Sequence, residues 1–154
     1  MTEFQDRRTI RDLVLDARTV AIVGLSASEL RASNFVGYYL QRHGYRVIPV
    51  NPNEERVLGE QVYPSLRDVP EHIDVVDVFR DRGAVPEIAR EAVEVGAGAL
   101  WLQFGVISDE GARIAQNGGL DVVMDRCLKV EHARLLGRMH WMGFDTGVIA
   151  GSRD

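Results

Sequence analysis

A stretch of small and hydroxyl-bearing residues, Gly24-Leu-Ser-Ala-Ser28, follows an apolar run at Val20–Val23. The run has the length and β-branched character of a buried strand, and the glycine ends it. A helical pattern resumes near Asn34. A strand, a tight turn and a helix in this order present backbone N–H groups and a helix N-terminus to a bound phosphate. We therefore expect this turn to hold a pyrophosphate.

The side chains in and after the turn suit the same chemistry. Ser26 and Ser28 offer hydroxyl donors in addition to the backbone amides. Arg31 and Ser33 come just before the predicted helix, where an arginine can clamp a diphosphate with two parallel hydrogen bonds. Pro52 offers a rigid apolar surface for an adenine ring. These residue types favour a phosphorylated adenine ligand, and an ordinary turn beside a solvated arginine is the alternative.

A nicotinamide dinucleotide is the usual ligand of a first strand–helix turn, and its signature is G-x-G-x-x-G. The chain has Gly24-Leu-Ser-Ala-Ser-Glu29, which keeps only the first glycine. Asn51 takes the place of the acid that binds the ribose hydroxyls at the end of the second strand. Arg56 could meet a ribose phosphate, so an NADP-dependent oxidoreductase domain is the alternative function. That function needs an acid–base pair in the cleft, and the sequence offers no convincing one.

No catalytic residue and no metal site is predicted. The four histidines are His43, His72, His132 and His140. They are scattered without metal-ligand spacing. Ser26 lacks an evident base, and no G-x-S-x-G motif occurs.

The one cysteine, Cys127, follows the last predicted strand. A buried cysteine usually behaves as a small apolar residue. Arg126 and the N-terminus of the following helix would favour the thiolate, so a redox role, such as a mixed disulfide with a ligand thiol, is the other interpretation.

Composition limits the class of protein. The chain has 154 residues, of which 45% are hydrophobic and 27% charged, so we expect one globular domain over residues 1–154. A net charge of −5 argues against nucleic-acid binding, because no basic field would attract the phosphate backbone. No apolar run reaches the ~18 residues of a membrane span, and the first residues lack the apolar core of a signal peptide. A single cysteine favours a cytoplasmic location.

The hydrophobic pattern alternates between strands and helices along the whole chain. Strands are expected at Val20–Val23, Arg46–Val50, Asp74–Phe79, Ala99–Gln103 and Asp121–Met124. Helices are expected at Asp6–Ala17, from Ser33 or Asn34 to His43, from Pro86 to about Val95, from Ser108 to Asn117, and at Lys129–Leu136. The stretch between Val57 and Leu66 looks irregular, with a single turn at Ser65–Val69. The apolar segment Met139–Phe144 would dock on its own domain or form a homodimer surface.

This alternation predicts a parallel sheet covered by helices on both faces. The simplest arrangement is a Rossmann-like, doubly wound α/β fold with a five-stranded parallel sheet in the order 3-2-1-4-5. Ligands of such a sheet bind over the carboxyl ends of the strands where the winding reverses, beside Gly24. The segments expected to meet there are Gly24–Ser28, Val50–Asn53, Val78–Asp81, Gln103–Val106 and Asp125–Cys127.

Six segments in order along the chain resemble the stand-alone coenzyme A-binding proteins, small bacterial and archaeal relatives of the CoA-binding domain of succinyl-CoA synthetase α subunits. The segments are Val20–Ser28, Gly44–Pro52, Leu58–Ser65, Ile73–Arg80, Leu100–Val106 and Val123–Cys127. Each motif alone is weakly specific, but six in register over nearly the whole chain are specific. The resemblance implies a nucleotide-binding domain that takes coenzyme A or an acyl-CoA. The synthetase's ATP-grasp partner and phosphohistidine half are not matched, so a non-catalytic binding or regulatory module is implied.

By position, the resemblance also implies which residues contact each part of the ligand. The diphosphate would be lined by Gly24, Ser26, Ala27, Ser28, Arg31 and Ser33. The adenosine would lie by Asn51 and Pro52, the nucleotide would be flanked by Phe79 and Arg80, and the pantetheine arm would be lined by Gln103, Phe104 and Gly105. Asn53 stands where many relatives carry lysine, so Arg56 or Arg80 would replace the contact to the 3′-phosphate.

Overall fold

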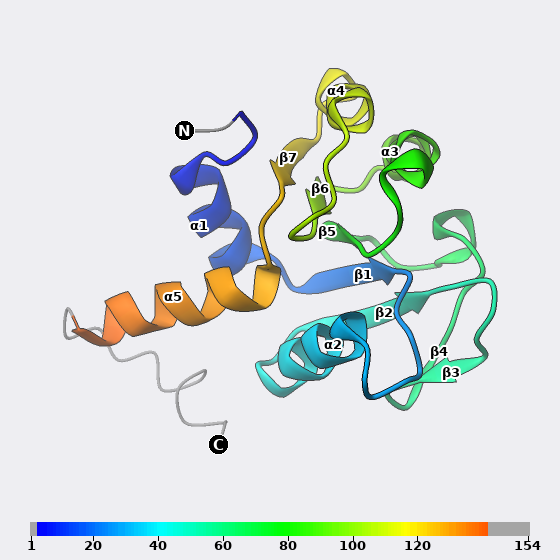
Figure 1. Ribbon diagram of the computed structural model, residues 1–154, viewed down its shortest axis with the longest axis horizontal. Helices are drawn as coiled ribbons and strands as arrows, with labels where there is room; N and C mark the ends of the chain where they lie inside the picture. The colour runs from blue at the N-terminus through cyan, green and yellow to red at the C-terminus, as the bar shows by residue number, and fades with distance from the viewer. Residues whose placement is uncertain (1–2, 142–154) are drawn as a thin grey trace.

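Five apolar runs of the sequence form a parallel sheet at the centre of the molecule (Figure 1). The computed structural model describes residues 3–141, and the side chains of residues 3–137. The strands of the sheet are β1 (Thr19–Val23), β2 (Arg46–Val50), β5 (Val75–Val78), β6 (Ala99–Leu102) and β7 (Asp121–Met124). Nearly every residue of these strands is buried, because helices cover both faces of the sheet. The predicted α/β class and five-stranded parallel sheet are confirmed.

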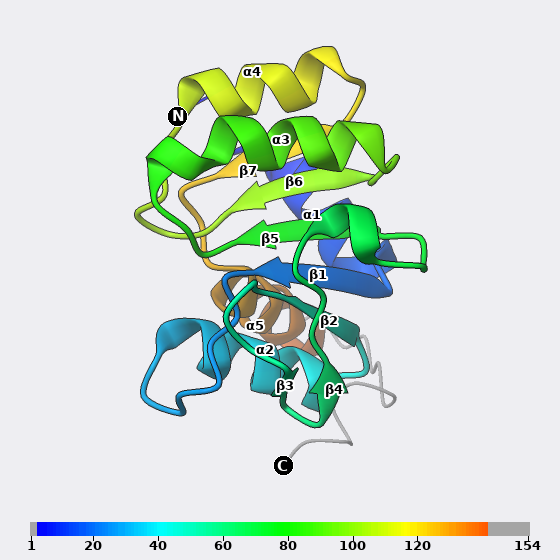
Figure 2. The same cartoon turned by 90° about the vertical axis from the view of Figure 1, so that its right-hand side faces the viewer.

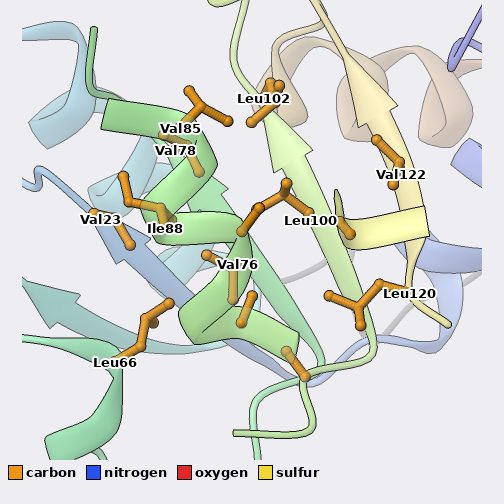
Figure 3. Packing of buried hydrophobic residues seen from close by; sticks show 14 of the residues in the cluster. Val23, Leu66, Val76, Val78, Val85, Ile88, Leu100, Leu102, Leu120 and Val122 are labelled. Atoms are coloured by element: carbon orange, nitrogen blue, oxygen red, sulfur yellow. The ribbon is translucent and has the colours of Figure 1, made fainter. Parts of the chain in front are cut away.

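Different helices cover the two faces of the sheet, and each set packs its buried side chains against one face (Figure 1). The face shown in Figure 3 is covered by α3 (Val85–Glu94) and α4 (Asp109–Asn117), with Ile88 packed near Val76 and Leu100. The other face is covered by α1 (Arg7–Asp16), α2 (Ala32–Arg42) and α5 (Leu128–Trp141). Within the described residues, no helix is both long enough and apolar enough to cross a membrane.

The predicted strand order 3-2-1-4-5 is wrong. The observed order is β2-β1-β5-β6-β7, which is 2-1-3-4-5 when the strands of the sheet are counted along the chain (Figure 2). The third strand, β5, pairs with β1 in parallel register, Val20 opposite Val75. The winding therefore reverses between β1 and β5, and ligands of such sheets bind at that point.

The outer edge of β2 explains the corrected order. The chain leaves β2 through a small hairpin, β3 (Arg56–Val57) and β4 (Glu60–Gln61), and then returns along β2. The Tyr63 N–H donates to the Pro49 carbonyl at 3.0 Å, and its own carbonyl accepts from the Asn51 N–H at 2.9 Å. Since this loop occupies the edge of β2, the next strand pairs with the free edge of β1 instead.

Helix ends agree with the sequence to within a residue, except at the start of the second helix and in the last helix. The expected cap of the second helix at Ser33 or Asn34 is wrong, because α2 begins at Ala32 and Arg31 takes the cap position without a side-chain hydrogen bond. The carboxylate of Asp6 accepts from the Thr9 N–H at 2.9 Å, and the Ser108 hydroxyl accepts from the Gly111 N–H at 3.0 Å, so both act as N-caps. The predicted single turn after the irregular stretch is confirmed as the 3₁₀ helix η1 (Leu66–Asp68). The last helix, α5, is longer than expected. The side chains of Met139–Phe144 lie outside the described residues.

Candidate functional site

The turn after β1 lies against the end of β5. Gly24 has a φ of +92°, and a Cβ atom built on it would lie 2.5 Å from the carbonyl oxygen of Phe79. Its N–H donates to the Val50 carbonyl at 2.8 Å. Only glycine fits this position, because any side chain would be strained and would also collide with the backbone of Phe79, just after β5. The residue therefore lets the ends of three neighbouring strands meet.

The amides of the turn are engaged by oxygens of the chain itself. The Ser26 N–H donates to the Ser33 hydroxyl at 3.0 Å, and the Ser28 N–H donates to the Ser26 hydroxyl at 3.0 Å. Between them, the Ala27 N–H donates to a carboxylate oxygen of Glu54 at 3.1 Å. The turn thus aims consecutive N–H groups at oxygen atoms, which is how a backbone holds a phosphate.

The N-terminus of α2 has no side-chain cap. The residue at its cap position, Arg31, accepts the first backbone bonds, from the Asn34 and Phe35 N–H groups. Within the described residues, the N–H groups of Ala32 and Ser33 have no acceptor. Unpaired amides at the positive end of a helix dipole attract anions. This end of α2 is therefore suited to a negatively charged group.

Two pockets lie side by side along the carboxyl ends of the strands. The first, which we call the turn pocket, has a volume of about 440 Å³. It is lined by Gly24, Ser26, Arg31, Ala32, Ser33, Asn51, Asn53, Glu54, Phe79 and Arg80. Two arginines, Arg31 and Arg80, line it, and neither forms an ion pair with a described residue. Together with the end of α2, they outweigh the single carboxylate in this pocket.

The second pocket, which we call the side pocket, has a volume of about 710 Å³. It is lined by Ala32, Val36, Phe79, Arg80, Asp81, Gln103, Phe104, Val106, Arg126, Cys127, Val130, Glu131 and Arg134. Ala32, Phe79 and Arg80 belong to both pockets, so the two cavities adjoin. Much of the side-pocket wall is apolar, and its charged rim includes the Arg134–Glu131 ion pair at 3.1 Å.

Gln103 is the buried polar group of the side pocket, with a relative exposure of 4%. Its Oε1 accepts from the Leu128 N–H at 3.1 Å, which fixes the amide at the start of α5. Its Nε2 has no acceptor in the described part of the chain. A buried amide donor in a cavity wall can bind a carbonyl oxygen of a ligand.

The structure gathers most of the predicted site residues around these two pockets. The turn pocket holds Gly24, Ser26, Arg31, Ser33 and Asn51, the side pocket holds Gln103 and Phe104, and both hold Phe79 and Arg80. The remaining predicted residues, Ala27, Ser28, Pro52 and Gly105, line neither pocket. Ala27 and Ser28 still belong to the turn, whereas the Gly105 N–H donates to Asp125 at 2.7 Å.

Asn51 was expected beside the adenosine, and it lines the turn pocket, where its amide also forms two hydrogen bonds with the backbone. Its Nδ2 donates to the Leu25 carbonyl at 3.1 Å, and its Oδ1 accepts from the Asn53 N–H at 2.9 Å. Both ends of the side chain therefore bind backbone and tie the loop after β2 to the turn after β1. This tie positions Glu54, a pocket residue that the sequence motifs did not indicate.

The segments expected to meet at the strand ends do contribute Asn53, Asp81, Val106 and Arg126 to the pockets, and the other pocket residues missed by sequence reasoning are Ala32, Val36, Val130, Glu131 and Arg134. The last three come from α5, whose packing across the strand ends no local pattern specifies. Cys127 is half-buried, and it both packs against the apolar core on the α2 and α5 side of the sheet and lines the side pocket. Its redox role stays a prediction. Among the described side chains, no three acidic, histidine or cysteine residues are grouped to hold a metal ion.

Comparison with known proteins agrees with this arrangement. A family model described as a CoA binding domain matches residues 18–133. The uncharacterized protein YneT of Bacillus subtilis (strain 168) is 36% identical over 124 residues, which cover 80% of this chain and 92% of that protein. The ADP-forming acetate–CoA ligase II of Archaeoglobus fulgidus is 30% identical over 110 residues, but these cover 70% of this chain and only 16% of the ligase.

Solved structures show the same fold. A hypothetical protein from Pyrococcus horikoshii OT3 has a TM-score of 0.83 and 38% identity, covering 89% of this chain and 100% of that one. A protein from Thermus thermophilus has a TM-score of 0.80 and 36% identity, covering 85% of this chain and 99% of that one. Since the family model spans most of the sequence, this chain belongs to the CoA binding domain family.

Proposed function

We propose that this protein binds coenzyme A or an acyl-CoA across the turn pocket and the side pocket, as a non-catalytic binding or regulatory module. The diphosphate would lie at the N-terminus of α2 and the turn after β1. The pantetheine arm would pass Phe79 and Arg80 into the side pocket, toward Gln103. Membership of the CoA binding domain family supports this ligand class.

The observation that carries the proposal is the uncapped N-terminus of α2. Its unpaired amides at Ala32 and Ser33 face a pocket that two guanidinium groups also line. This pocket lies where the winding of the sheet reverses, between β1 and β5. Backbone donors, a helix dipole and arginine side chains at one point form a site for a multiply charged phosphate group.

The shape of the two pockets suits a ligand with a charged centre and a long arm. The turn pocket is polar, and the adjoining side pocket is larger and has apolar walls from Val36, Val106 and Val130. A pantetheine arm carries amide groups along a flexible chain that ends in a thiol. The Nε2 of Gln103 would donate to one of those amide carbonyls.

The pocket acids support binding rather than chemistry. Glu54 accepts from the Ala27 N–H, and Glu131 accepts from Arg134. A general acid or base needs a free proton-transfer partner within reach of the substrate, and these two carboxylates are engaged in structural contacts, whereas the third pocket acid, Asp81, is exposed to solvent. The family model is a CoA binding domain and the named enzyme among the relatives is an acetate–CoA ligase, so the comparisons give no support to the NADP alternative.

Isothermal titration calorimetry of the intact protein tests the proposal. CoA, acetyl-CoA, NADP and NAD are titrated under the same conditions. We expect saturable binding of CoA or acetyl-CoA and weaker or no binding of the two nicotinamide cofactors. Tighter binding of NADP would support the oxidoreductase alternative, and the absence of heat with all four ligands would show that the cleft binds none of them.

A further inference from the structure

An acidic side chain accepts a hydrogen bond from a backbone N–H group that the proposed ligand would use. The carboxylate of Glu54 accepts from the Ala27 N–H, the middle amide of the turn after β1. The amides on either side donate to neutral serine hydroxyls. A carboxylate oxygen at this point stands where a phosphate oxygen of the ligand would lie.

The fold holds Glu54 in this place. Asn51 ties the loop after β2 to the turn through its bond to the Leu25 carbonyl and accepts from the Asn53 N–H. Glu54 is half-buried and lines the turn pocket together with Arg31 and Arg80. No cation among the described residues forms an ion pair with it. The bond to the turn amide is therefore the one hydrogen bond of its carboxylate in the described structure.

We propose that Glu54 is an internal anion that fills the phosphate turn of the free protein and is displaced by the phosphate of the ligand. The inference rests on the proposed function. A phosphate oxygen and the Glu54 carboxylate would compete for the Ala27 N–H. Two negative groups next to the same amide would also repel each other. The residue thereby sets the affinity of the pocket for phosphate-bearing ligands.

The effect depends on the ligand. CoA and dephospho-CoA both carry a diphosphate, so both must displace the carboxylate. Pantetheine has no phosphate and would occupy only the side pocket. Removing the charge of Glu54 should strengthen binding of the first two compounds and leave pantetheine binding unchanged.

The variant Glu54→Gln isolates the charge, because glutamine has the same shape and keeps an acceptor for the Ala27 N–H. Glu55→Gln is the matched control, since it removes an equal charge from the next residue, which is exposed and has no side-chain hydrogen bond or ion pair in the described structure. Calorimetric titration of both variants and the wild type uses CoA, dephospho-CoA and pantetheine at low and high salt. Thermal melts confirm that each variant is folded, and Glu54→Ala serves if the glutamine variant is not.

We expect Glu54→Gln to lower the Kd for CoA about three- to tenfold at low salt, the range for one nearby charge in a partly exposed site. The gain should shrink at high salt through screening. Glu55→Gln should bind CoA like the wild type. In ¹⁵N–¹H spectra of the wild type, the Ala27 amide resonance should shift when CoA is added.

Two negative results are distinguishable. If the wild type binds CoA while Glu54→Gln binds it no more tightly, or more weakly, then Glu54 is a bystander or a ligand contact, and this inference is wrong while the proposed function stands. If neither the wild type nor either variant binds CoA or dephospho-CoA, the proposed function is wrong, and the proposed displacement of Glu54 is wrong with it.

Discussion

At the turn after β1, a single backbone position decides whether the cleft can form. Gly24 has a positive φ and lies against the carbonyl of Phe79, so a side chain here meets two separate penalties. Gly44 has nearly the same φ, +91°, but a Cβ atom there would meet nothing within 4 Å. Comparing the same substitution at the two glycines therefore distinguishes the cost of backbone strain from the cost of the collision with Phe79.

We predict that Gly24→Ala destabilises the protein more than Gly44→Ala. The strain of a left-handed alanine costs about 1–2 kcal/mol at either position. The collision in Gly24→Ala adds about 1–3 kcal/mol, because the β5 backbone must move. Urea denaturation measures both losses, and CoA titration should show impaired binding only for Gly24→Ala. Equal stability losses would mean that the close approach to Phe79 is unimportant.

Arg31 stands at the cap position of α2 and lines the turn pocket. If its guanidinium clamps the diphosphate, Arg31→Ala should weaken CoA binding by about 1.5–3 kcal/mol, or about 10- to 150-fold in Kd, the range for charged hydrogen bonds. Arg18→Ala is the control, because that arginine precedes β1 at the opposite end of the strand. Calorimetric titration with CoA measures the Kd of both variants, and Arg18→Ala should bind like the wild type. An unchanged Kd for Arg31→Ala would remove the residue from the site.

At this scale, sequence reasoning identified residues whose role follows from neighbours in the chain. Gly24, Arg31 and Ser33 sit within one strand–turn–helix unit, and their types alone indicated phosphate chemistry. Glu54 was missed because its contact with Ala27 joins two loops that only the folded sheet brings together. The contact of Asn51 with the ligand stays a prediction, and no motif indicated that its amide would also bind backbone on both sides.

Among the elements, β5 contains a buried acid and leads directly into Phe79 and Arg80, which line both pockets. Asp77 lies in the middle of this strand, between Ile22 on β1 and Trp101 on β6, with 0% exposure. Neither carboxyl oxygen has a hydrogen-bond partner in the described structure. Burial therefore raises the pKa of Asp77 well above its ordinary value of 3.8.

The raised pKa of Asp77 determines how its contribution to the free energy of unfolding changes with pH. The folded state favours the protonated acid, so its contribution is fully present below about pH 4 and is lost as the pH rises toward the raised pKa. We predict that Asp77→Asn gains stability relative to the wild type as the pH increases from 4 to 7. Urea denaturation at several pH values measures the difference, with the exposed Asp121→Asn as control. Parallel pH profiles of wild type and Asp77→Asn would contradict it.

The elements themselves were largely predictable, and their order in the sheet was not. Apolar runs of the right length marked every strand of the large sheet, because strands buried on both faces must be apolar throughout. The order depended on whether the loop after β2 would occupy the edge of that strand. The contacts of Tyr63 with Pro49 and Asn51 settle this, and no local sequence pattern indicates them.

Across the whole molecule, the proposed site is built from parts that are distant in sequence. The turn pocket joins the ends of β1, β2 and β5, and the side pocket adds α5 and the end of β6. Figure 2 shows these strand ends on the same edge of the sheet. A ligand that spans both pockets would contact elements from α2 to α5 at once. Unfolding would break all of these contacts together, so binding should stabilise the fold as a unit.

We predict that CoA at 100 times its Kd raises the free energy of unfolding by about 2.7 kcal/mol, because the ligand binds only the folded state. For a chain of this size, the melting temperature should rise by about 5–11 °C. The same CoA concentration should stabilise Arg31→Ala by about half as much or less, since its Kd is higher. NADP at equal concentration should shift the wild type little. A larger shift with NADP than with CoA would mean that the pockets recognise a nicotinamide cofactor, and equal CoA shifts in wild type and variant would place the ligand away from α2.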